Sequence, residues 1–420
     1  MIDDNSRRQF LQALAIAGPS MLMAKKLMAQ IPDTLIPGIG PYSDEWLPVG
    51  MRSRFVDNVN GLRVHVLETG YETPNRPVLL LLHGFPELAY SWRKVMVPLA
   101  EAGYHVLAPD LRGYGRTTGW SSDYDTDLTP FRMLNKVRDA IGLISAFGYR
   151  YVDAVIGHDF GSPLAAWCAV TRPDIFRSVV MMSAPFGGTS SIPFDTISNP
   201  TPEPISGPSI YDDLANLPRP RKHYQRYYNT RGANESMWHA EQGLSNFIRA
   251  YYHHKSADWK DNRPYRLAAR TAVEWAKMPT YYIMDLNDSM AETVARVMPT
   301  TSEINANTWL TEAELEVYSA EYGRTSFQGG LNSYRMGASG IGNAETQLYA
   351  GKTIDQPSMF ISGASDWGTY QNPGSFERMQ ERTCTDMRSV HLVEGAGHWV
   401  QQEQASETSR LLLAFLDSLA

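Results

Sequence analysis

The chain has 420 residues, of which 43% are hydrophobic and 20% are charged, and its formal net charge is -7 at pH 7. This length allows a large core, arranged either as two or three domains or as one α/β core that carries an insertion. The negative charge and the lack of any lysine or arginine run argue against a nucleic-acid-binding protein.

The N-terminus carries the motif Ser6-Arg7-Arg8-Gln9-Phe10-Leu11, followed by a short apolar segment that Pro19 interrupts. This pattern resembles a twin-arginine export signal, and the apolar segment is too short to span a bilayer. We therefore expect residues 1–30 to be an export signal and 31–50 a linker, in a protein that is periplasmic or secreted. The alternative is an amphipathic or disordered N-terminal tail.

From about residue 52 the pattern is that of an α/β domain. Asn60-Gly61 is a strong hairpin signal, and the aliphatic run 78–82 is typical of a central strand buried on both faces. Strands are predicted at 52–59, 62–69, 78–82, 104–108, 154–156, 178–182, 357–362 and 390–393. Helices are predicted at 92–102, 134–147, 162–170 and 405–419. This alternation predicts a mostly parallel sheet with helices on both faces.

The alternation stops between residues 186 and 350. This stretch is rich in tyrosine, tryptophan and polar residues and has helical patterns but no buried-strand pattern, and its early part (193–220) is dense in proline. We expect it to be a mainly helical cap inserted into one α/β core formed by residues 51–185 and 351–420.

The remaining composition gives no sign of a metal or a disulfide framework. Cys168 is expected on a helix against the core, and a bridge to Cys384 is disfavoured. His253-His254 lie in a polar tract and are predicted to be a solvated surface pair rather than metal ligands. No cofactor or metal is therefore expected.

The segment Val155-Ile156-Gly157-His158-Asp159-Phe160-Gly161-Ser162 is the G-x-S-x-G nucleophile elbow with aspartate in place of serine. Gly157 and Gly161 leave room for a sharp turn from strand to helix, which presents Asp159 at the carboxyl edge of the sheet. Ser162-Pro163 is predicted to start the helix, with serine as its cap.

Open α/β sheets place their sites beyond the carboxyl ends of the strands. Asp159, Asp366 and His398 each follow a predicted strand, and His83-Gly84-Phe85-Pro86 follows the central one. Taken singly, Asp366 could cap a helix, His398 could be a turn residue, and His83 is expected only to shape its loop. Together, in this order, they favour a catalytic set.

An aspartate nucleophile favours attack on a saturated carbon, which gives an alkyl-enzyme ester. His398, oriented by Asp366, would activate water, and the backbone N–H groups of Phe85 and Phe160 would stabilise the oxyanion. A halide leaving group needs side-chain N–H donors, which these two phenylalanines lack, whereas an epoxide oxygen needs acidic hydroxyl groups such as those of tyrosine.

Five motifs resemble those of the soluble, α/β-hydrolase-fold epoxide hydrolases. They are His83-Gly84-Phe85-Pro86-Glu87, Gly157-His158-Asp159-Phe160-Gly161, His223-Tyr224-Gln225-Arg226-Tyr227-Tyr228, Phe327-Gln328-Gly329-Gly330-Leu331-Asn332-Ser333-Tyr334-Arg335 and Gly397-His398-Trp399. The resemblance implies an α/β-hydrolase fold, Asp159 as nucleophile, Tyr224 and Tyr334 as donors to the epoxide oxygen, and His398 with Asp366 as the hydrolytic pair. Tyr227 and Tyr228 remain alternatives to Tyr224.

The chain departs from this family in three ways: Phe160 stands where tryptophan is usual, the cap is longer, and an export signal is unusual. The favoured function is cofactor-independent hydrolysis of a small apolar epoxide with water. The alternatives are a haloalkane or haloacid dehalogenase that uses Asp159, and a non-catalytic exported binding protein. Aromatic residues of the cap suggest an apolar pocket, namely Tyr227, Trp238, Phe247 and Tyr281.

Overall fold

The computed structural model describes residues 39–192 and 209–419. The predicted export signal, the first part of the linker and residues 193–208 of the proline-rich stretch lie outside the described residues. Within these two ranges, no helix is both long enough and apolar enough to cross a membrane.

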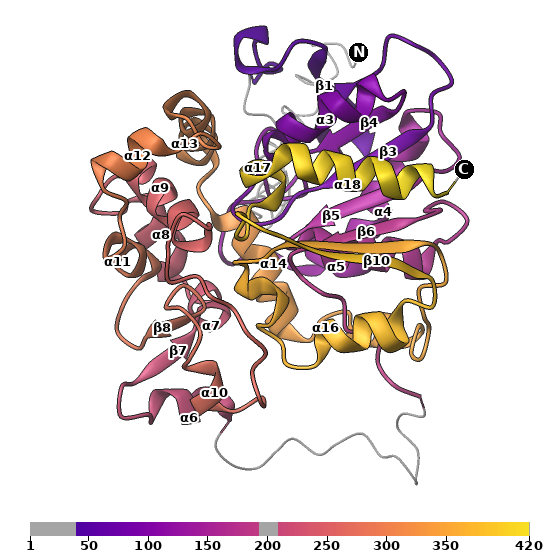
Figure 1. The fold of residues 1–420 in the computed structure, drawn as a ribbon. Helices are drawn as coiled ribbons and strands as arrows, with labels where there is room; N and C mark the ends of the chain where they lie inside the picture. The colour runs from indigo at the N-terminus through magenta and orange to yellow at the C-terminus, as the bar shows by residue number, and fades with distance from the viewer. Residues whose placement is uncertain (1–38, 193–208, 420) are drawn as a thin grey trace, which may run out of the picture.

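An eight-stranded sheet organises the described chain, in the order β1-β2-β4-β3-β5-β6-β9-β10 (Figure 1). Its strands are β1 (Met51–Val59), β2 (Leu62–Thr69), β3 (Val78–Leu82), β4 (His105–Pro109), β5 (Ala154–His158), β6 (Val179–Met182), β9 (Ser358–Gly363) and β10 (Met387–Val393). The pairs β1–β2 and β2–β4 are antiparallel, and all other neighbouring strands are parallel. The predicted mostly parallel sheet is thus confirmed.

Helices cover both faces of this sheet. They are α3 (Arg93–Glu101), α4 (Met133–Ala146), α5 (Gly161–Thr171), α16 (Ser375–Arg378), α17 (Val400–Glu403) and α18 (Ala405–Asp417). Because alternate residues of a strand point to opposite faces, Leu79 and Leu81 pack in the core under α3 and α18, whereas Leu80 and Leu82 pack under α4 and α5.

Short helical turns complete the core. They are the 3₁₀ turns η1 (Asp44–Trp46), η2 (Ala89–Trp92), η3 (Thr129–Phe131) and η4 (Trp367–Thr369), and the π-helical turn η5 (Met379–Thr383).

Among the described elements between β6 and β9, those from α6 to α13 lie to one side of the sheet, whereas α14 lies next to the sheet (Figure 1). The elements of this segment are α6 (Ile210–Ala215), β7 (Arg221–His223), α7 (Tyr224–Tyr228), α8 (Gly232–Trp238), α9 (Leu244–Lys255), α10 (Ala272–Trp275), β8 (Ile283–Asp285), α11 (Met290–Ala295), α12 (Thr301–Ala306), α13 (Glu312–Thr325), α14 (Gln328–Ser339) and α15 (Asn343–Gln347). We call them the cap elements. The antiparallel pair β7–β8 was not predicted, because three-residue strands are too short to show an alternating pattern.

The predicted hairpin is confirmed: β1 and β2 pair with Val59 opposite Leu62, and Asn60 and Gly61 both have positive φ, of 49° and 81°. Such a two-residue turn matches the twist of the flanking strands. Cys168 and Cys384 are buried and free, so the disfavoured bridge is absent.

Two predictions about polar residues were wrong. Ser162 does not cap α5, which begins at Gly161; its hydroxyl group instead donates to the carbonyl of Ala184 at 2.6 Å. His253 and His254 are buried rather than solvated; the ring of His254, for example, packs edge-on against those of Trp259 and Tyr281. Neither histidine belongs to a metal-binding cluster among the residues that the structure describes.

Candidate active site

The nucleophile elbow is a strained turn between β5 and α5. Asp159 has a φ of 51°, a left-handed conformation that is uncommon for a residue other than glycine. A Cβ on Gly157 would lie 1.9 Å from the carbonyl oxygen of Gly161, and a Cβ on Gly161 would lie 2.0 Å from that of Leu82. Both glycines are therefore required by close backbone contacts, and the turn points Asp159 away from the sheet.

The Asp159 carboxylate is held from two sides. The backbone N–H of Phe85 donates to Oδ1 at 2.9 Å, and Nε2 of His398 lies 3.3 Å from Oδ2. Burial raises the pKa of Asp159, but His398 and Lys255 outweigh this effect and hold the pKa well below its ordinary value. The carboxylate is thus ionised at neutral pH while its side chain remains 13% exposed.

His398 lies between two carboxylates. Its Nδ1 is 3.1 and 3.2 Å from the two carboxylate oxygens of Asp366, which also accepts the N–H of Gly368 at 2.7 Å. Asp366 therefore both caps η4 and orients the histidine. With Nδ1 donating to Asp366, Nε2 is left as the basic nitrogen that faces Asp159. Burial and Lys255 lower the pKa of His398, but the two carboxylates outweigh them and raise it above its ordinary value.

The loop after β3 brings the backbone to the carboxylate. A Cβ on Gly84 would lie 2.3 Å from that of Asp159, so only glycine allows this approach. Nε2 of His83 accepts the N–H of Leu111 at 3.0 Å, so its Nδ1 carries the hydrogen that is donated to the carbonyl of Gly84 at 2.9 Å. His83 shapes the loop, as expected, and the Phe85-Pro86 peptide within it is cis.

Tyr334 on α14 lies over the two phenylalanines predicted to form the oxyanion site. Its ring centroid is 4.6 Å from that of Phe160 and 5.4 Å from that of Phe85, both in edge-on geometry. Tyr224 lies next to it, with ring centroids 6.0 Å apart. Burial raises the pKa of both phenols, and the charge of Asp159 raises each further, so both hydroxyl groups are protonated and able to donate.

The two alternative tyrosines are engaged elsewhere. The hydroxyl group of Tyr227 is hydrogen-bonded to Ser236 within the cap elements, and that of Tyr228 donates to Tyr251 at 3.1 Å. Among the three, Tyr224 is therefore the one whose geometry fits a second donor beside Tyr334.

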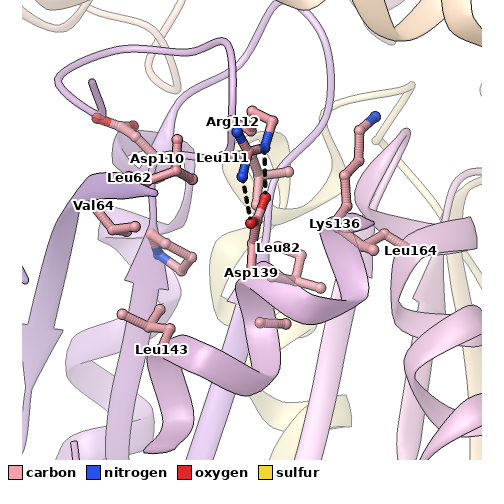
Figure 2. A pocket seen from close by; sticks show the side chains of 12 residues that line it. Leu62, Val64, Leu82, Asp110, Leu111, Arg112, Lys136, Asp139, Leu143 and Leu164 are labelled. Atoms are coloured by element: carbon pink, nitrogen blue, oxygen red, sulfur yellow. Dashed lines mark hydrogen bonds and ion pairs between the residues drawn. The ribbon is translucent and has the colours of Figure 1, made fainter. Parts of the chain in front are cut away.

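The helix that carries Tyr334 is braced by the core. Lys136 on α4 donates to the hydroxyl group of Ser333 at 2.7 Å, and the backbone of Gly113 packs directly on that of Gly329. Arg112, next to Gly113, forms a bidentate ion pair with Asp139, with N–O distances of 2.7 and 2.9 Å (Figure 2). The loop after β4 thus supports α14 against the core.

Three buried residues at the site were given no role from the sequence. Glu87 is 2.6 Å from Nδ1 of His158, whose Nε2 donates to the carbonyl of His398 at 2.7 Å. The third is Lys255, whose carbonyl accepts the N–H of His398 at 2.9 Å. Glu87 and His158 lie inside motifs already recognised, but Lys255 stands in a polar tract and carries no sequence signal.

The aromatic residues expected to line a pocket mostly build the cap itself. The indole N–H of Trp238 donates to the carbonyl of Gly323 at 3.1 Å, and Phe247 packs edge-on against Phe327 at 5.5 Å. The ring centroid of Phe327 in turn lies 6.1 Å from that of Phe85, so these contacts connect the cap elements to the loop 83–86 after β3.

Comparison with known proteins agrees with this geometry. A family model described as alpha/beta hydrolase fold matches residues 77–405. Epoxide hydrolase B of Mycobacterium tuberculosis is 33% identical over 370 residues, which cover 86% of this chain and 97% of that protein. The chain belongs to the α/β-hydrolase-fold epoxide hydrolase family. Another relative in this family, epoxide hydrolase A of the same organism, is 31% identical over 87% of this chain and 97% of its own length. Among solved structures, an epoxide hydrolase from an endophytic Streptomyces superposes with a TM-score of 0.69 at 30% identity, over 89% of this chain and 97% of that one.

Proposed function

We propose that this protein hydrolyses a small epoxide to a vicinal diol without a cofactor, through a covalent ester on Asp159. The observation that carries the proposal is that three kinds of group surround the carboxylate of Asp159. These are the backbone donor of Phe85, the His398–Asp366 pair, and two protonated tyrosines, Tyr224 and Tyr334.

In the first step, Oδ2 of Asp159 attacks a ring carbon of the epoxide. The carbon–oxygen bond of the ring breaks, and the oxygen that leaves takes a proton from Tyr334 or Tyr224, so that a hydroxyalkyl ester forms. Oδ1, held by Phe85, becomes the carbonyl oxygen of this ester. Phenols suit this step because the charge on the ring oxygen develops only as the bond breaks.

In the second step, Nε2 of His398 takes a proton from water, and the resulting hydroxide attacks the carbonyl carbon of the ester. The N–H of Phe85, together with that of Phe160 at the start of α5, stabilises the oxyanion on Oδ1. The tetrahedral intermediate collapses with cleavage of its bond to the ester oxygen of the substrate, and the leaving alkoxide takes the remaining proton of the attacking water. The diol is released, Asp159 is again a carboxylate with one oxygen from water, and the proton on His398 passes to the tyrosinate. The sum is one epoxide and one water consumed for one diol.

Single turnover in heavy-oxygen water tests this mechanism. With enzyme in excess over styrene oxide, we expect diol without heavy oxygen and one heavy oxygen in the peptide that contains Asp159. An Asp159→Asn variant should form no diol. Heavy oxygen in the first diol would mean direct attack by water and would overturn the assignment of Asp159. Halide release from haloalkanes without any diol would indicate a dehalogenase.

We also propose that residues 1–30 direct export of the protein. The support is the motif Ser6-Arg7-Arg8-Gln9-Phe10-Leu11 with its short apolar segment. Replacing both arginines by lysine should leave the full-length chain inside the cell, whereas the native chain should be found shortened in the exported fraction. Equal export of both would contradict the proposal.

A further inference from the structure

Lys255, the last residue of α9, places a buried cation next to the site. Only 3% of its surface is exposed. Its Nζ lies over four aromatic rings, at distances to the centroids of 5.2 Å (Tyr282), 5.3 Å (Trp399), 5.6 Å (Tyr251) and 5.9 Å (Tyr281). Within the described ranges, Nζ has no hydrogen-bond acceptor and no ion-pair partner, yet it is not fully enclosed.

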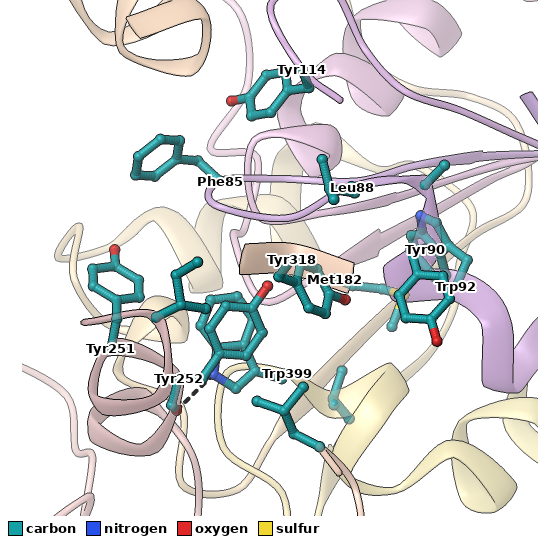
Figure 3. Packing of buried hydrophobic residues seen from close by; sticks show 14 of the residues in the cluster. Phe85, Leu88, Tyr90, Trp92, Tyr114, Met182, Tyr251, Tyr252, Tyr318 and Trp399 are labelled. Carbon is teal, nitrogen blue, oxygen red and sulfur yellow. Dashed lines mark hydrogen bonds between the residues drawn. The ribbon is translucent and has the colours of Figure 1, made fainter. Parts of the chain in front are cut away.

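The rings around Lys255 are also the walls of the site. The ring of Trp399 lies 4.6 Å from that of His398, and the ring of Tyr282 lies 5.2 Å from that of Tyr224. Figure 3 shows Tyr251 and Trp399 in the same buried cluster as Phe85. The ammonium group therefore lies against one ring that contacts His398 and another that contacts Tyr224, close enough to Asp159 and Asp366 for their charges to act on it.

A largely buried ammonium group without a protein acceptor is costly, because it has lost most of its contact with water and gained no hydrogen bond from the protein in return. Aromatic faces recover part of this cost but accept no conventional hydrogen bond. Two partly buried lysines of the core have acceptors: Lys136 donates to Ser333 at 2.7 Å and Lys94 to the carbonyl of Trp309 at 2.7 Å. Lys255 has no such acceptor.

Nearby carboxylates do not provide one. Burial lowers the pKa of Lys255, while Asp159, Asp366 and Glu87 oppose that shift from beyond ion-pair range. These carboxylates favour the charged form of the lysine but leave its three N–H donors unused. A ligand oxygen that carries one negative charge would give Nζ the acceptor it lacks, whereas a dianion such as a phosphate would be repelled about twice as strongly by the three carboxylates.

We propose that Lys255 binds a carboxylate of the substrate, so that the preferred substrate is an epoxide with an apolar body that carries a carboxylate a few bonds from the ring. This inference rests on the proposed function, and it adds a charged end group to the apolar epoxide expected from the aromatic surroundings. A charge-assisted hydrogen bond of this kind favours the acid over an isosteric neutral amide by about ten- to a hundredfold in kcat/KM.

The test uses matched pairs of substrates: 3,4-epoxybutanoate and 4,5-epoxypentanoate, each against its primary amide. The native protein should favour at least one acid by the factor above, and Lys255→Met should bring the acid-to-amide ratio to about one or below. The ratio within one variant cancels any loss common to both substrates. Lys260→Met removes an exposed lysine of the same charge and should keep the native ratio.

The outcomes separate this inference from the proposed function. Hydrolysis of acid and amide at equal rates by the native protein overturns the role of Lys255 and leaves the epoxide hydrolase intact. If neither these epoxides nor styrene oxide is hydrolysed, the proposed function fails, and calorimetric binding of pentanoate against pentanamide then decides whether Lys255 binds a carboxylate. Should Lys255→Met not fold, Lys255→Arg must keep the preference for the acid and Lys255→Gln must lose it.

Discussion

Replacing His398 by glutamine should separate the two steps of the proposed reaction. The first step needs an ionised Asp159, and His398 is one of the groups that keeps the pKa of this carboxyl low. After the substitution, the N–H of Phe85 still donates to Oδ1 at 2.9 Å and the charge of Lys255 still acts on the carboxylate. Asp159 therefore stays ionised at pH 7 to 8, and the ester should still form.

The second step loses its base. General-base catalysis contributes roughly 10²- to 10⁴-fold, which corresponds to about 3–5 kcal/mol in the barrier to ester hydrolysis. Steady-state diol formation by His398→Gln should fall by this factor, and the covalent ester should accumulate. Mixing the variant with excess styrene oxide should consume one equivalent of epoxide rapidly and release almost no diol.

Intact-mass measurement of the quenched mixture, followed by peptide mapping, detects the ester as one added epoxide on the peptide that contains Asp159. Asp159→Asn should show no adduct, and His239→Gln, which alters an exposed cap histidine, should turn over normally. A folded His398→Gln variant that turns over at the native rate, or that forms no adduct, would refute the two-step assignment.

Three further results are expected. Tyr334→Phe should lower kcat/KM for styrene oxide by about ten- to a hundredfold, since a charge-stabilising donor is lost, whereas Tyr227→Phe, at a hydroxyl group engaged within the cap, should change it little. The single-turnover rate of ester hydrolysis should fall at acid pH as His398 is protonated. Its midpoint should lie below the pKa of His398 in the free protein, which NMR titration would give, because the two carboxylates raise that pKa and the ester no longer carries the charge of Asp159. Gly161→Ala should lower the melting temperature and cost about 1–3 kcal/mol or more, because the new methyl group would overlap a main-chain oxygen of β3; Gly337→Ala, at a helical glycine with open space around it, should stabilise by about 0.5–1 kcal/mol.

Each of these has a clear contrary result. Equal losses in Tyr334→Phe and Tyr227→Phe would assign the effect to packing of the cap rather than to proton donation. A rate of ester hydrolysis that is flat below neutrality would exclude His398 as the base. A Gly161→Ala variant as stable as the native protein would show that the elbow can relax.

The strands of the sheet could be predicted from the sequence because a parallel strand buried on both faces is a continuous aliphatic run, and this pattern does not depend on which residues pack against it. The run at β3 is one example, and the Asn60-Gly61 hairpin is another, since its turn needs two residues with positive φ. The nucleophile elbow could also be predicted, because close backbone contacts at positions 157 and 161 allow only glycine there.

The failures arose where side chains depend on partners distant in sequence. Ser162 was assigned to the helix end beside it, but its hydroxyl group bonds to a carbonyl that follows β6. His253 and His254 were predicted to be solvated because their neighbours in sequence are polar, yet both are buried, and His254 packs against Tyr281, which is distant in sequence. The role of Lys255 was not predicted for the same reason, since its aromatic neighbours come from three separate segments of the chain.

The hydrogen bond from the N–H of His398 to the carbonyl of Lys255 has a consequence for synthesis of the protein. The loop of His398 rests on the backbone at the end of α9, where a Cβ on Gly397 would lie 2.5 Å from the carbonyl carbon of Ser256. The ribosome completes the elbow of Asp159 long before it adds this last loop. A chain cut short after the cap would lack Asp366 and His398, and with them the base that hydrolyses the ester, as well as strands β9 and β10 of the central sheet.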